Sequence, residues 1–245
     1  MMKKTLIVLT LLVFVLPLSA CGLNSKGSND QHQTSKVKPK VKKDEALIKK
    51  NQTIWTKLTK DAEVVKTDAY SGDSIVPTKL SDLKKAGNIV KGTVYNLEQM
   101  DAPKNMALTK AKIRIDQVLS GDKSLTGKDY YVVLRGGLTT TDVYYADMNR
   151  TKEVDHDILV ENPEAPLPKI GTQFITVLDK NNLANGSEYS QILMKSGFTK
   201  TNSLPIFDEQ FSFWIKDKTG KYVLNNPKAS TDLEDLTWDI NHNYA

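Results

Sequence analysis

Apolar residues are spaced differently in successive parts of the chain, and this spacing divides it into segments. An apolar run over residues 6–16 follows Lys3 and Lys4. A run of about 7–15 residues after a basic start is typical of a secretory signal and too short to span a membrane. Residues 22–43 then hold only three aliphatic side chains among Ser, Asn, Gln, Gly and Lys. Because so few cannot offset the entropy of ordering, we expect a disordered tether there, about 25 Å from end to end.

Helical spacing of apolar residues begins at residue 44. It continues over residues 44–66 among good helix formers, which predicts a helix there. A short helix is predicted over 81–86, with Ser81 as its N-cap and Gly87 as its end. A capping box at 231–234 predicts a C-terminal helix, one face of which would carry Leu233, Leu236 and Ile240.

Between these helices, alternating or continuous runs of apolar and β-branched residues predict strands. The predicted strands are 88–97, 106–119, 130–134, 171–178 and 189–194, followed by a hairpin of 207–215 and 221–224. Residues 138–169 lack periodicity and contain three prolines, so we expect a long loop there.

Glycines recur at matching places in several of these strands. The run IVKGTV at 89–94 is followed by VLSGD at 118–122, VVLRGG at 132–137 and PKIGTQF at 168–174. Over about residues 81–224 this pattern resembles a widespread extracellular bacterial β-barrel module that is OB-like in strand order. The resemblance implies a fold but no functional residue, because its motifs are structural and members of the group are largely uncharacterised lipoproteins or cell-surface proteins.

The signal-like run ends at Leu18, Ser19, Ala20 and Cys21, and Cys21 is the chain's only cysteine. These four residues resemble the lipobox of bacterial lipoproteins, in which the thiol is diacylglycerylated and the chain is cut just before it. The resemblance implies anchoring through diacylglyceryl-Cys21, with chains such as palmitate, on the extracytoplasmic face of a Gram-positive-type cell membrane. The alternative is a buried or free thiol without a role. Lipid modification explains both the position of Cys21 and the absence of any other cysteine from the sequence.

Together these patterns predict a mainly β protein with flanking helices (α+β). It would consist of a small OB-like β-barrel, a C-terminal capping helix and the disordered N-terminal tether. The expected divisions are a signal peptide at 1–20, a lipid-anchored flexible tether at 21–43, a helical lead-in at 44–80 and an OB-like β-barrel domain with the C-terminal helix at 81–245.

Charge is distributed unevenly between the tether and the remainder of the chain. Residues 21–60 carry ten Lys against three acidic residues, whereas residues 61–245 carry 22 basic and 26 acidic residues. Nucleic-acid-binding proteins place their basic face on the folded module, so we expect no nucleic-acid partner. The Lys-rich tether could instead contact anionic lipid or an anionic wall polymer, or serve only as a soluble spacer.

The sequence contains no catalytic signature. His32, His156 and His242 are its only histidines, and it lacks the paired His or Cys of zinc enzymes, a P-loop and a G-x-S-x-G motif. We therefore predict no catalytic residue, no cofactor and no bound metal.

Two groups in the predicted 138–169 loop are candidates for ligand binding. Asp155, His156 and Asp157 lie among further carboxylates, which could hold a hard cation, make His156 a pH responder, or form an ordinary solvated loop. Tyr144 and Tyr145 could stack on sugar rings or on a peptide, or could belong to the core. A concave aromatic face would add Tyr130, Tyr131 and Trp214.

The expected function is that of a non-enzymatic, membrane-anchored binding or interaction module facing the cell wall, with an unidentified protein or glycan ligand. The alternative is a hydrolase of wall or extracellular polymer that uses the carboxylates of residues 142–164. A third hypothesis has the Leu233, Leu236 and Ile240 face dock on another surface protein. Against it stands the ordinary packing of such a stripe on the protein's own core.

Overall fold

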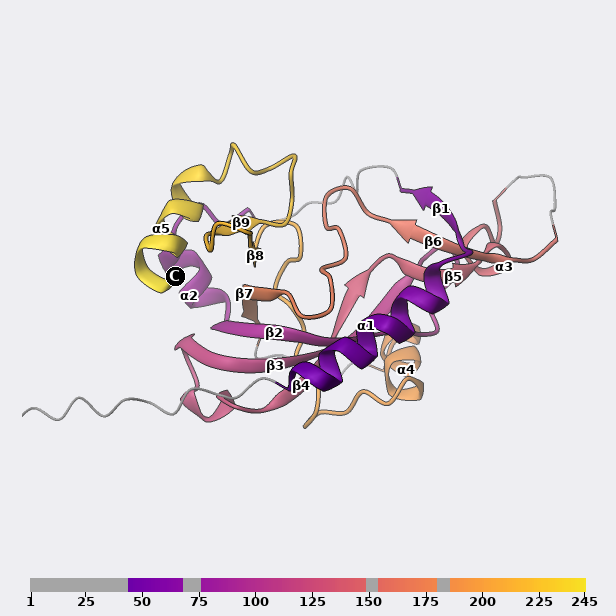
Figure 1. The fold of residues 1–245 in the computed structure, drawn as a ribbon, viewed down its shortest axis with the longest axis horizontal. Helices are drawn as coiled ribbons and strands as arrows, with labels where there is room; N and C mark the ends of the chain where they lie inside the picture. Colours follow the sequence, from indigo (N-terminus) through magenta and orange to yellow (C-terminus); the bar gives the residue numbers. More distant parts are fainter. Residues whose placement is uncertain (1–43, 68–75, 149–153, 180–185) are drawn as a thin grey trace, which may run out of the picture. The chain divides into compact units, whose positions relative to one another are not determined.

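The computed structural model describes residues 44–67, 76–148, 154–179 and 186–245, and there the chain forms a mixed α+β fold with two sheets (Figure 1). The helices are α1 (Glu45–Thr59), α2 (Leu80–Ala86), α3 (Thr141–Tyr144), α4 (Glu188–Lys195) and α5 (Glu234–Tyr244), with a 3₁₀ turn η1 (Lys123–Leu125). The strands are β1 (Glu63–Lys66), β2 (Asn88–Gln99), β3 (Leu108–Ser120), β4 (Asp129–Arg135), β5 (Gly137–Thr140), β6 (Asp157–Glu161), β7 (Gln173–Leu178), β8 (Phe213–Lys216) and β9 (Tyr222–Leu224). The expected signal peptide and tether, with Cys21, lie outside the described residues.

The larger sheet has the order β4-β3-β2-β7-β8-β9, with antiparallel neighbours throughout. Its end strands β4 and β9 do not pair with each other, so the expected closed barrel is wrong, whereas the β-rich α+β class is confirmed. The outer edges of β9 and β4 are instead hydrogen-bonded to other parts of the chain. The Asn241 side chain on α5 accepts from the Tyr222 N–H at 2.8 Å and donates to its carbonyl at 2.7 Å. On β4, Tyr131 exchanges backbone hydrogen bonds with Asn202 and Leu204.

The two faces of this sheet are covered by different helices. Successive residues of a strand point to opposite faces. Val90 and Phe174 therefore join the core cluster that includes Ile48 of α1. Their neighbours Ile89 and Ile175 join the cluster that includes Leu83 of α2 and the apolar residues of α5. The central strands β2 and β7 are consequently buried on both sides.

The first predicted helix is correct in position but shorter than expected. α1 ends at Thr59, and residues 63–66, which we expected to be helical, form β1. β1 carries two β-branched residues, Val64 and Val65, and pairs in parallel with β6. At the C-terminal end of the predicted helix, pairing with a distant strand therefore determines the structure in place of the helical pattern of the sequence.

The long loop predicted over 138–169 is wrong at residues 138–144 and 157–161. It contains β5, α3 and β6, and β6 lies between β1 and β5 in a three-stranded sheet. These strands have four or five residues each. They are too short to show a period in the sequence and depend on pairing with one another.

The strand predicted at 189–194 is also wrong, because these residues form α4. The Ser187 hydroxyl accepts from the Ser190 N–H at 3.2 Å, which caps the helix, and Leu193 packs against Phe198. A serine followed by Glu188 is a helix-start signal, and it identifies this segment better than the short apolar run does.

The other predicted elements are confirmed with different ends. β2, β3, β4 and β7 form where expected, and so does the β8–β9 hairpin, although residues 207–212 precede its first strand. α2 begins after Lys79 rather than Ser81, and α5 begins after Leu233 without a side-chain cap, so the predicted capping box does not form.

The apolar stripe of the C-terminal helix packs on the protein's own sheet. Leu233, Leu236 and Ile240 are 2%, 1% and 0% exposed, and the indole N–H of Trp214 donates to the Thr237 hydroxyl at 3.0 Å. These three side chains are therefore not available to a partner, and the docking hypothesis for this face is wrong.

Replacing Leu236 by alanine tests this packing. Leu236→Ala should lower the free energy of unfolding by about 3 kcal/mol, because it leaves a cavity between α5 and the sheet. The matched control is Leu58→Ala on α1, where the side chain is 51% exposed and the loss should stay below about 1 kcal/mol. Urea unfolding of both variants measures the difference, and equal losses would contradict the burial of α5.

Candidate functional site

Asp155, one of the predicted ligand residues, supports the start of α3. Its Oδ1 accepts from the Asp142 N–H at 2.9 Å and from the Thr141 hydroxyl at 3.1 Å. The hydrogen bond from the Asp142 N–H, followed by that from Thr141, lowers the pKa of the Asp155 carboxyl. This carboxylate is therefore engaged in holding the 138–157 segment together.

His156 and Asp157 belong to the small sheet. Nε2 of His156 lies 3.2 Å from Oε2 of Glu63 on β1, and its Nδ1 lies 3.0 Å from the Val154 carbonyl. The side chains of His156 and Glu63 are 39% and 65% exposed, so solvent screens this contact and it contributes little to stability. Asp157 is the exposed first residue of β6 and is paired with Thr140.

Tyr144 and Tyr145 pack against a small apolar cluster. Their rings meet edge to face with centroids 5.0 Å apart, and both lie against the cluster that contains Ala107, Ile158 and Val160. The structure thus brings the five predicted ligand residues to one end of the small sheet, where each makes contacts that support the fold. In the described part of the chain, no three His, Cys, Asp or Glu residues lie close enough together to hold a metal ion.

The wider aromatic face is not formed as expected. Trp214 is fully buried beneath α5, and Tyr222 is buried beside it. Tyr130 and Tyr131 are half-buried and pack against different core clusters. The prediction that Trp214 lines a concave aromatic surface is therefore wrong, because this residue belongs to the core.

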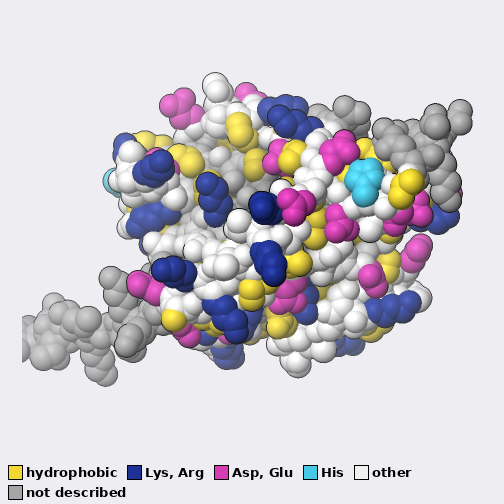
Figure 2. All heavy atoms as spheres, turned by 45° about the vertical axis from the view of Figure 1, so that its right-hand side comes forward, with side chains coloured by type: hydrophobic (Ala, Val, Ile, Leu, Met, Phe, Trp, Pro, Cys, Tyr) yellow, Lys and Arg dark blue, Asp and Glu magenta, His cyan; other side chains and the backbone are white. Residues whose placement is uncertain are grey.

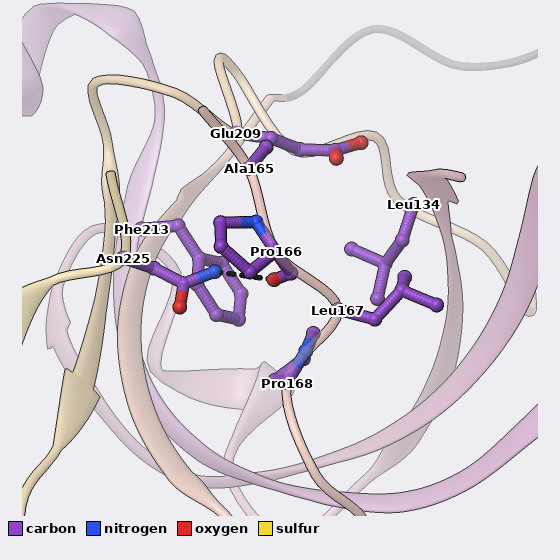
Figure 3. A pocket seen from close by; sticks show the side chains of 8 residues that line it. All are labelled: Leu134, Ala165, Pro166, Leu167, Pro168, Glu209, Phe213 and Asn225. Atoms are coloured by element: carbon purple, nitrogen blue, oxygen red, sulfur yellow. Dashed lines mark hydrogen bonds between the residues drawn. The ribbon is translucent and has the colours of Figure 1, made fainter. Parts of the chain in front are cut away.

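A small hollow lies where the proline-containing segment 165–168 passes the large sheet (Figure 3). The space inside it amounts to about 10 Å³, which is room for about one water molecule. Figure 3 shows Phe213 and Asn225 on one side, Leu134 and Leu167 on the other, and Glu209 extending across the top. The Asn225 amide donates to the Pro166 carbonyl at 2.6 Å and so fixes the proline segment in place.

Glu209 is the ionisable group of this hollow. Burial among apolar groups raises its pKa to about 7, although its Oε2 accepts from the Arg135 N–H at 3.0 Å and the Arg135 charge opposes the shift. The Asp208 carboxylate accepts from the Gln210 and Phe211 N–H groups, which holds the turn that carries Glu209. A carboxyl with such a pKa changes charge near neutrality.

A second carboxylate, Glu164, begins the same proline segment. Its Oε2 accepts from the Gln210 amide at 2.9 Å, and its Oε1 lies 3.3 Å from the Lys228 ammonium. Successive residues of one turn therefore contact different elements: Gln210 holds the start of segment 164–168 through Glu164, and Glu209 holds the end of β4 through Arg135. The hollow is far smaller than the ~300–1,000 Å³ of ordinary ligand pockets and has room for about one water molecule, so it is a packing gap and not a ligand pocket.

The sequence also did not predict a cluster of polar side chains at the edge of the sheet face that α5 covers. The Thr93 hydroxyl donates to Asp116 at 2.7 Å, and the Lys91 ammonium lies 5.5 Å from the ring centre of Tyr222. Burial, followed by the Asp116 charge, raises the pKa of Tyr222 to about 12, and burial lowers the pKa of Lys91. Tyr222 Oη is buried without a hydrogen-bond partner among the described residues.

None of these residues stands out in the sequence. Glu209 and Glu164 are 45 positions apart along the chain, and Thr93, Asp116 and Tyr222 come from three strands. Only the Pro166-Leu167-Pro168 triplet is a local signal, and it predicts an extended loop.

Comparison of the chain with protein-family models, with curated proteins and with solved structures found no match. No helix within the described residues is long and apolar enough to cross a bilayer.

Replacing Glu209 by glutamine tests the environment of this carboxyl. Because its pKa is higher in the folded than in the unfolded chain, the folded state binds more protons between about pH 4.5 and pH 7, and stability falls as the pH rises through that range. In Glu209→Gln this part of the pH dependence, about 2 kcal/mol, should disappear. Urea unfolding between pH 4 and pH 8 measures it.

The control for this experiment is Glu161→Gln, which changes an exposed carboxyl on β6. It should leave the pH profile of stability as in the parent. A Glu209→Gln profile that is superimposable on the parent's would show that Glu209 is solvated in the folded protein.

Proposed function

We propose that this protein is a bacterial surface lipoprotein that acts by binding rather than by catalysis. Diacylglyceryl-Cys21 would hold it on the extracytoplasmic face of the cell membrane, facing the wall. The observation that carries the proposal is the sequence Leu18-Ser19-Ala20-Cys21, which directly follows a short apolar run and contains the chain's single cysteine. A lone cysteine in an exported protein cannot form an internal disulfide, so modification is its most direct use.

The contacts of the polar candidates support a binding role over a catalytic one. The predicted hydrolase would need a free carboxylate pair, whereas Asp155 holds α3 and Glu164 is engaged by Gln210 and Lys228.

We further propose that the larger sheet is an opened relative of the OB-like module. The meander β2-β3-β4, the return of β7 to the other edge of β2 and the three register shifts between β2 and β3 support this relationship. An OB-like strand order requires a bent first strand that pairs with two neighbours, and β2 occupies this position. In this protein the two edge strands, β4 and β9, do not pair with each other. Instead β9 is hydrogen-bonded to α5, and β4 is hydrogen-bonded to the 202–204 segment.

Removing the thiol tests the anchor. Cys21→Ala should release the protein from the membrane fraction into the culture medium and abolish incorporation of labelled palmitate, because two acyl chains supply nearly all the membrane affinity. Asn24→Ala, three residues further along, is the matched control and should stay in the membrane fraction. Incorporation of labelled palmitate into Cys21→Ala at the level of the parent would refute the lipoprotein assignment, because no other cysteine could carry the lipid.

A further inference from the structure

α1 has an outer surface that is basic along most of its length. Lys49, Lys50, Lys57 and Lys60 are all exposed at or just beyond this helix. At about 100° per residue these four positions fall on one side of the helix, together with the exposed Thr53. No acidic residue occurs between Lys49 and Lys60, while Asp44, Glu45 and Asp61 lie at the two ends.

Two large apolar side chains adjoin this stripe of lysines. Ile54 and Leu58 are 48% and 51% exposed, and they are one turn apart on the flank of the basic side. Exposed apolar residues beside lysines on one helix are characteristic of segments that lie in a membrane interface. An anionic polymer would use the lysines alone, so the apolar flank favours a lipid surface.

The opposite side of α1 is fixed to the large sheet. Ile48 is buried, Leu47 and Trp55 pack on the same core cluster, and the Asn51 amide donates to the Tyr95 carbonyl at 2.8 Å. The Gln52 amide donates to the Ile170 carbonyl at 2.7 Å. The lysine side is thus presented on a rigid base, which removes most of the ordering cost of contacting a flat surface.

We propose that this outer surface of α1, formed by Lys49, Lys50, Ile54, Lys57, Leu58 and Lys60, docks on the anionic membrane from which the chain's own anchor extends. The inference rests on the proposed function in one respect, since the anchor at Cys21 sets the local concentration. The 22 residues between Cys21 and Asp44 can span at most about 75 Å, so an anchor at Cys21 would keep the start of α1 within that distance of the lipid surface and raise its effective concentration there.

On the face drawn in Figure 2, Lys and Arg side chains are mixed with Asp and Glu, and hydrophobic side chains are scattered between them. Residues 61–245 carry 22 basic and 26 acidic residues. Attraction to anionic lipid would therefore come from the α1 stripe and from the lysines that precede it, and not from the net charge of the body.

The test uses the unlipidated mature chain, with Cys21→Ala, and vesicles of phosphatidylcholine with or without phosphatidylglycerol. A lysine near an anionic surface raises partitioning about fivefold at moderate ionic strength, so Lys50→Gln with Lys57→Gln should weaken binding to the anionic vesicles by more than tenfold. The matched control is Lys84→Gln with Lys85→Gln, the same charge change on α2, which covers the other face of the sheet. It should change binding less than threefold.

A fluorescent label then reports which side touches the lipid. Because Cys21 is the only cysteine, Cys21→Ala with Thr53→Cys carries a single environment-sensitive dye on the outer side of α1, and Cys21→Ala with Ser81→Cys carries it on α2. Anionic vesicles should shift the emission of the first to the blue and leave the second unchanged.

Three results would overturn the docking proposal. They are equal losses in the two lysine pairs, equal emission shifts at the two labelled positions, and binding to soluble polyphosphate without binding to the vesicles. None of these bears on the anchor, since the chain used here has no lipid, so the lipoprotein assignment stands or falls separately with the Cys21→Ala palmitate-labelling experiment.

Discussion

Strand β2 has to be paired on both edges and covered on both faces, and most of the described body is arranged to meet that requirement. β3 pairs along its length and β7 pairs over its first half. Gly92 makes this possible, because a Cβ there would lie 2.6 Å from the Phe174 ring and 2.7 Å from the Arg114 carbonyl oxygen. The ring that takes this space stacks on Phe213 at 5.2 Å and links β2, β7 and β8 in one core. α1 then closes one face of the sheet, and α2 and α5 close the other.

The sequence was informative where an element carries its own signal. β2 and β3 are long enough for their alternation to be visible, and the glycine that ends α2 marks its boundary. The small sheet has no such signal, since β1 finds β6 more than ninety residues away and each strand is stable only through the other. α4 was mistaken for a strand because Ile192, Leu193 and Met194 form an apolar run that fits either structure, and its serine cap decides the matter.

The predicted ligand residues lie close together, and their binding of a ligand stays a prediction. Tyr144, Asp155 and His156 do lie at one end of the small sheet, where a cap, an exposed ion pair and an aromatic contact use them. The hollow beside Glu209 could not be found in advance, because its walls come from β4, the proline segment and β8. The raised pKa of Glu209 is a property of that assembly, and its position between Phe207 and Phe211 in the sequence does not show which groups surround it in the fold.

The hydrogen bonds beneath α1 have a mechanical meaning in an anchored chain. If the chain is anchored through Cys21 as proposed, a pull on the anchor would enter the folded body at Asp44, whose N–H donates to the Tyr95 hydroxyl at 3.2 Å. It is then carried along α1 by Asn51 and Gln52, which hold the helix to β2 and to the segment before β7. Load applied along the helix axis is shared among these contacts, whereas load applied across it would peel them apart one at a time. In an anchored protein, the direction of the pull relative to the α1 axis would therefore set how many of these contacts share the load.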